Sequence, residues 1–141
     1  MVTIKTGFSG ITYTAGESLL PDNEVWWLES DATIAKGLFV ELVTAGHFKL
    51  ADATPAAHIG ISLAASTDGD IVPILVKGTG TVTADAVGVA IGDFVVPDSA
   101  GKADVATLGT TGVCGLCKNA SGAAGVAVVE LMSISIDTDT T

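Results

Sequence analysis

The chain has 141 residues and a net charge of −10 at pH 7, with 16 acidic residues against six basic ones, all of them lysine. This length suits one compact core. Because arginine is absent and acidic residues dominate, the basic patch that nucleic-acid binding needs is missing, and we expect no nucleic-acid partner. No apolar run approaches the roughly 18 residues of a membrane span, and no basic-then-apolar leader opens the chain. We therefore expect no membrane partner and synthesis in the cytoplasm.

Residues 1–36 form the first segment and carry most of the aromatic side chains. Between Pro21 and Gly37, the possible end caps favour a helix, whereas the run from Glu24 to Glu29 favours a strand, and both remain open. We predict that the segment is an arm or a capping layer. An arm can add a strand to another chain, but it can equally be an edge strand of its own sheet. The candidate partner-binding residues are Val2, Ile4, Phe8, Tyr13, Trp26 and Trp27.

Adjacent residues of a strand point to opposite faces. One ring of the Trp26–Trp27 pair is therefore expected in the core and the other on a partner surface. The alternative is that both rings cap a barrel.

From residue 37 onward the pattern is β. A short turn with Gly46 separates the apolar runs 38–43 and 47–51, which predicts a hairpin. Further short strands are predicted at 59–63, 71–76, 80–83, 93–96, 103–106, 113–117 and 126–136. Many short strands separated by turns are typical of a small β-barrel or sandwich, so we predict a mainly β domain over residues 37–141.

An internal repeat is the most specific feature, because residues 37–76 overlay residues 92–131 at a constant offset of 55 without a gap. Gly46 and Gly101 coincide in a turn that needs a positive φ. Gly60 and Gly115 coincide inside an apolar strand, where a bulge or a close backbone approach excludes a side chain. The repeat predicts that the domain is built from two similar β units.

No motif in the sequence supports catalysis. Cys114 and Cys117 have C-x-x-C spacing, but a zinc site needs further ligands and a redox pair should open a helix, so we interpret them as packing thiols. His47 and His58 lack a nucleophile or carboxylate at motif spacing. The segment 68–70 lacks the calcium-loop pattern and reads as a solvated turn. We predict no enzyme activity, no cofactor and no metal.

The chain resembles small phage head proteins of the lambda head decoration type in the segments Gly37–Val40, Ala57–Ser62 followed by Asp70–Gly78, and Ile91–Val96. The resemblance covers residues 37–131. It implies a β-rich barrel that forms a homotrimer, binds the major capsid protein on the outer surface of the virion and stabilises the expanded head. It also implies an N-terminal arm that orders on the capsid. The internal duplication departs from the lambda type and puts the topology and the trimer in doubt.

Two other functions remain open on the sequence. One is a phage tail-tube or fibre component. The other is a carbohydrate-binding adhesive β domain, in which Trp26 and Trp27 would form the sugar site.

Overall fold

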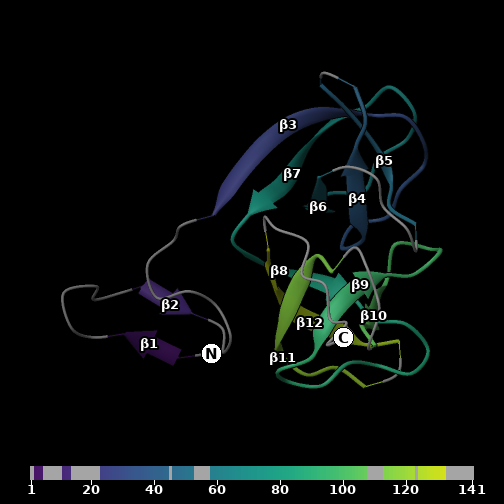
Figure 1. The fold of residues 1–141 in the computed structure, drawn as a ribbon. Helices are drawn as coiled ribbons and strands as arrows, with labels where there is room; N and C mark the ends of the chain where they lie inside the picture. Colours follow the sequence, from purple (N-terminus) through teal and green to yellow (C-terminus); the bar gives the residue numbers. More distant parts are fainter. Residues whose placement is uncertain are drawn as a thin grey trace.

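The fold is made of β-strands, as predicted (Figure 1). The computed structural model describes residues 2–4, 11–13, 23–44, 46–52, 58–107, 113–122 and 124–132. Over these ranges there is no helix, and hence none long and apolar enough to cross a membrane. The prediction of a mainly β fold with a small barrel is confirmed.

The first β unit is a closed barrel in which the strands follow the order β3-β5-β4-β6-β7. Its strands are β3 (Glu24–Ser30), β4 (Phe39–Leu42), β5 (His47–Leu50), β6 (Ile59–Ser62) and β7 (Ile71–Lys77). All neighbours are antiparallel except β3 and β5, whose parallel pairing closes the ring.

Strand β3 decides the ambiguity between Pro21 and Gly37 in favour of a strand. It pairs with β7 from Glu24 to Glu29, so its strand-favouring side chains outweigh the capping signals. By this pairing β3 belongs to the barrel, although it lies inside the predicted segment 1–36. The position of a domain boundary remains a prediction, but the first β unit extends back to Glu24.

The second β unit repeats this topology with the strand order β10-β9-β11-β12-β8. Its strands are β8 (Thr79–Thr83), β9 (Phe94–Pro97), β10 (Ala103–Val105), β11 (Gly115–Asn119) and β12 (Val126–Leu131). The parallel contact at the equivalent place is a single bridge between Ala84, the residue after β8, and Ala103 of β10. The second unit is therefore the same five-stranded arrangement, closed less completely.

Even the pairing register is duplicated at the offset of 55 residues, so the two similar units predicted from the repeat are confirmed. Three pairs of the first unit recur in the second. Val40–Gly60 corresponds to Val95–Gly115, Ser62–Ile74 corresponds to Cys117–Val129, and Ile34–Ser66 corresponds to Val89–Ser121.

Glycines hold the same roles in both units. Gly46 and Gly101 have φ angles of +81° and +72°, which L side chains rarely adopt. A methyl group added at Gly60 would lie 2.8 Å from the carbonyl oxygen of Leu75, and one added at Gly115 would lie 2.8 Å from that of Glu130. The predicted close backbone approach is therefore present in both copies.

Two apolar clusters form the core. The first fills the barrel of the first unit and contains Leu28, Ile34, Val40, Phe48, Val72, Ile74 and Val76. The second joins the units, because Phe39, Ile61 and Leu75 of the first unit pack with residues of the second, among them Val82, Val95, Ala103, Cys114, Cys117, Ala127 and Val129.

Small side chains in the second unit make room for this packing. Gly80 stands opposite Val129, as Trp26 stands opposite Ile74 in the first unit. A methyl group on Gly80 would lie 2.7 Å from Cδ2 of Leu75. The missing side chain lets the first unit pack closely against the second.

Candidate partner-binding surface

The tryptophan pair lies on β3, and both rings are exposed. Trp26 is 45% and Trp27 is 68% exposed, so the expectation that one ring enters the core is wrong. The strand does alternate as predicted. Trp26 points to the same side of the strand as buried Leu28. It stays exposed because it lies near the end of the barrel, where fewer core side chains surround it.

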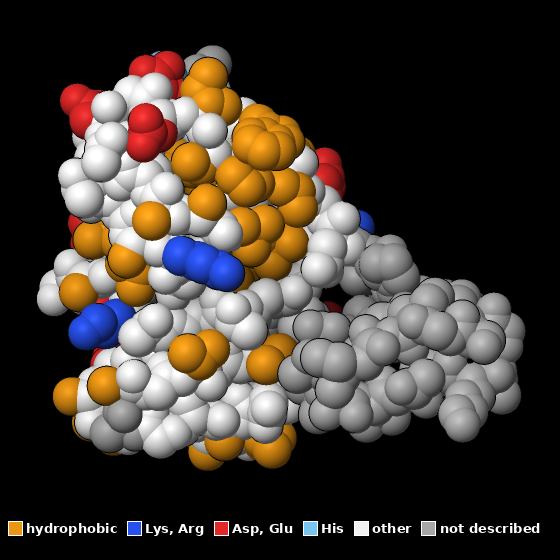
Figure 2. Space-filling model, turned by 180° about the vertical axis from the view of Figure 1, so that it is seen from behind, with side chains coloured by type: hydrophobic (Ala, Val, Ile, Leu, Met, Phe, Trp, Pro, Cys, Tyr) orange, Lys and Arg blue, Asp and Glu red, His pale blue; other side chains and the backbone are white. Residues whose placement is uncertain are grey.

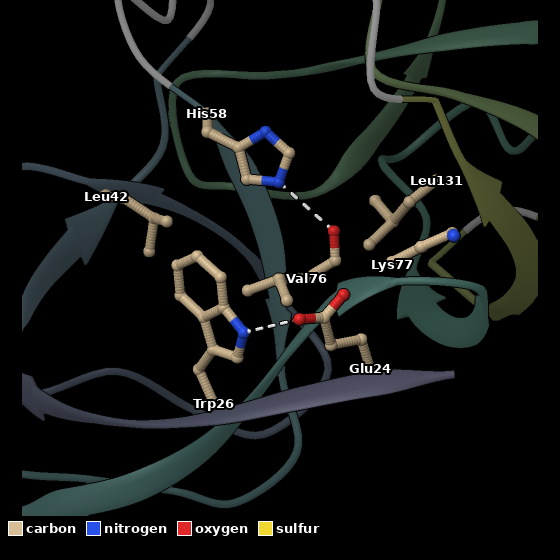
Figure 3. Close-up of a pocket in the computed structure, with 7 residues that line it drawn as sticks. All are labelled: Glu24, Trp26, Leu42, His58, Val76, Lys77 and Leu131. Carbon is tan, nitrogen blue, oxygen red and sulfur yellow. Dashed lines mark hydrogen bonds between the residues drawn. The ribbon is translucent and has the colours of Figure 1, made fainter. Parts of the chain in front are cut away.

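Trp26 forms one wall of a pocket of about 350 Å³ at this end of the barrel (Figure 3). The pocket is lined by Glu24, Trp26, Leu42, His58, Val76, Lys77 and Leu131. The indole Nε1 donates a hydrogen bond of 2.9 Å to Oε1 of Glu24, and Nε2 of His58 lies 3.1 Å from the carbonyl oxygen of Val76. The pocket thus combines aliphatic walls with polar groups that already bond to each other.

Trp27 belongs to a different surface, which we call the outer patch and define as Val25, Trp27, Ile71 and Pro73 on strands β3 and β7. Val25 is 42% and Ile71 is 65% exposed, and Trp27 lies directly opposite Pro73 in the strand register. Figure 2 shows hydrophobic side chains gathered on the part of the molecule that the first unit forms. Isolated exposed apolar residues need no explanation, whereas these four apolar side chains lie together on one sheet face.

Acidic side chains border the outer patch at its Ile71 end. Glu29 lies opposite Ile71 in the register, and the exposed turn containing Asp68 and Asp70 leads into β7. The backbone N–H and the hydroxyl of Thr67 donate hydrogen bonds of 2.8 and 3.0 Å to Oδ2 of Asp70 and lower its pKa. This geometry is that of the predicted solvated turn.

His47 does have carboxylate neighbours, contrary to the expectation from motif spacing. The parallel pairing of β5 with β3 brings its Nδ1 to 2.8 Å from Oδ1 of Asp31 and its Nε2 to 3.7 Å from Oε2 of Glu29. The hydrogen bond with Asp31 raises the pKa of His47, and the charge of Glu29 adds to this effect. Sequence spacing could not reveal this cluster, because it depends on how the barrel closes.

The two cysteines are free and buried in the same core cluster. Burial raises the pKa of the Cys114 thiol to about 12, and burial also raises the pKa of Cys117. Sγ of Cys114 lies 3.6 Å from the carbonyl oxygen of Val95. These surroundings are those of packing thiols, since a reactive cysteine needs a stabilised thiolate. The described part of the chain also contains no group of three or more side chains that could hold a metal ion.

The remaining candidate residues lie near the start of the chain. Strands β1 (Val2–Ile4) and β2 (Ile11–Tyr13) form an antiparallel two-stranded sheet of their own, in which Val2 is opposite Tyr13 and Ile4 is opposite Ile11. Phe8 lies outside the described residues. A role for this strand pair on a partner stays a prediction.

The fold and these surfaces define a mainly β protein with two five-stranded units and two exposed tryptophans on different surfaces. No protein-family model matches the chain, and no curated protein matches it. Among solved structures, it is similar to the N base of the head fiber gp8.5 of bacteriophage phi29, with a TM-score of 0.59 and 10% sequence identity. The similarity covers 82% of this chain and 98% of that chain. At this identity the comparison shows a shared fold.

Proposed function

We propose that the chain is a structural virion protein that attaches to the outer surface of a phage head. The observation that carries the proposal is the fold similarity to a phage head fiber base, because it includes nearly the whole of that base and most of this chain. The buried, protonated thiols and the exposed apolar patch fit a protein whose activity is binding.

The finer parts of the proposal are the partner and the assembly. We take the partner to be the major capsid protein, the oligomer to be a homotrimer and the effect to be stabilisation of the expanded head. Many copies placed by capsid symmetry would let modest contacts resist expansion forces. The similar structure is a fiber base, so it supports attachment to a head and gives no support to the lambda decoration type.

The same similarity favours a second role, that of a fibre component. In this second role the chain would be joined to a projecting fibre on the head, whereas as a decoration protein it would not. Electron microscopy of decorated heads distinguishes them, because only a base would appear beneath a projecting fibre.

Co-sedimentation tests the proposal. The purified chain is mixed with heads of the source phage stripped of their minor proteins, in compact and in expanded form. Saturable binding to expanded heads is the expected result. A variant lacking residues 1–22 is the matched test of the N-terminal strand pair, and weaker binding of this variant would give the pair a role. Absence of binding to either form would overturn the proposal.

A further inference from the structure

The second unit can be compared with the first to show which surface residues the shared fold requires. Strand β8 occupies in the second unit the place that β3 occupies in the first, and both pair along the equivalent strands β12 and β7. At the positions of Val25 and Trp27, strand β8 has Thr79 and Thr81, by the register with β12. The second unit therefore folds with threonines at these two positions. Folding alone does not explain why β3 has apolar side chains there.

The outer patch also continues an interface that the molecule already uses. Val25 lies opposite Leu75 in the register, and Leu75 is 1% exposed because the second unit packs over it. From Leu75 through Pro73 to Ile71, one sheet face thus runs from a buried contact to open solvent. The exposed part is an apolar surface around a tryptophan. Tryptophan is among the residues that contribute most to binding at the centre of protein–protein interfaces.

Charge restricts what can cover this face. Glu29, Asp68 and Asp70 border the Ile71 end, whereas the other end, at Leu75, is covered by the second unit. Figure 2 shows acidic side chains near the apolar area and also a basic side chain at its lower edge. A partner with lysine or arginine around an apolar hollow would complement this arrangement.

Two other occupants fit less well. A second copy of the chain would bring a further net charge of −10 to a face that acidic residues already border. The chain's own first 22 residues contain one basic residue, Lys5, beside Glu17 and Asp22. Neither supplies a basic rim.

We propose that the outer patch is the surface by which the chain docks on the phage head, with Trp27 inserted into an apolar hollow of a capsid protein and Glu29 facing a basic residue beside that hollow. This inference rests on the proposed function and adds the face, the anchor residue and the chemistry of the partner.

Binding of variants to stripped, expanded heads tests the inference. Trp27→Thr installs the residue that β8 has at the equivalent site, and Ile71→Asp places a charge in the patch. Val126→Asp is the matched control, because Val126 is the repeat equivalent of Ile71 and is 62% exposed. We expect Trp27→Thr and Ile71→Asp to weaken binding about 30-fold, the size of a hot-spot loss, and Val126→Asp to leave it unchanged.

Salt and charge reversal test the partner's chemistry. Binding of the unaltered chain should weaken as salt is raised, and Glu29→Lys should weaken it further and reduce the salt dependence. Thermal unfolding followed by circular dichroism verifies that each variant is folded.

The outcomes separate the two proposals. If the unaltered chain binds and folded Trp27→Thr binds equally well, the docking face is wrong while head attachment stands. Salt-independent binding that is lost in Trp27→Thr and inhibited by free sugars would replace the basic protein partner with a glycan. If the unaltered chain does not bind heads at all, both proposals fail.

Discussion

At the scale of single residues, burial has chemical consequences that composition alone does not show. Cys114 is 3% exposed, and its pKa of about 12 leaves about one thiol in 10,000 ionised at a pH of about 8. The thiolate is the form of cysteine that reacts. Cys114 and Cys117 can therefore have C-x-x-C spacing and still be chemically unreactive.

Alkylation measures this inertness. In the folded protein we expect iodoacetamide to modify Cys114 at least about 100-fold more slowly than in the urea-unfolded chain, because the thiol is both protonated and enclosed. Mass spectrometry of the peptides after timed quenching assigns the modification to Cys114 or Cys117. Equal rates in the folded and unfolded chain would contradict the burial of this thiol.

Sequence reasoning placed some residues correctly for physical reasons. Gly46 and Gly101 recur in a turn that requires a positive φ, and that requirement is local. Exposure is not local, so the alternation of Trp26 and Trp27 gave their directions but could not show that the barrel ends beside Trp26. The pairing of His47 with Asp31 likewise depends on a strand contact between distant segments.

At the scale of strands, the duplicated close approach of β6 to β7 and of β11 to β12 gives a matched pair of substitutions. Gly60→Ala places a methyl group 2.7 Å from Cγ2 of Ile74, and Gly115→Ala places one against Cγ1 of Val129. Each should destabilise the protein by about 1–3 kcal/mol, the usual range for overpacking a core.

Urea unfolding of the variants measures these free energies. Gly122→Ala is the control, because an added methyl group meets no atom within 4 Å there, and its free energy of unfolding should stay within about 0.5 kcal/mol of the original. A loss at Gly60 without a comparable loss at Gly115 would show that the two copies are not packed alike.

One strand pair of the repeat escaped detection in the sequence. Strands β3 and β8 are equivalent, yet Glu29 and Thr83 are 54 positions apart, whereas Ile34 and Val89 are 55 apart. The second copy thus has one more residue between the end of its first strand and the following bridge. The side chains also differ, since β8 has threonine where β3 has Val25 and Trp27. A gapless comparison at an offset of 55 residues therefore does not align β3 with β8.

At the scale of the whole molecule, the two units share one topology but pack differently. The first closes as a barrel around Phe48, while the second has Ala103 at the equivalent position and packs with Phe39, Ile61 and Leu75 of the first. This difference was not predictable from the repeat, because it depends on side-chain volumes that act only when the units meet. One face of the first unit is consequently half covered, and its uncovered half is the outer patch.

Cryo-electron microscopy of expanded heads saturated with the purified chain tests the central claim most directly. The account predicts symmetry-related density on the outer surface that fits the two β units, with strands β3 and β7 turned toward the capsid. Heads that show no added density under saturating conditions would contradict head attachment. Density that places β3 and β7 away from the capsid would contradict the docking face.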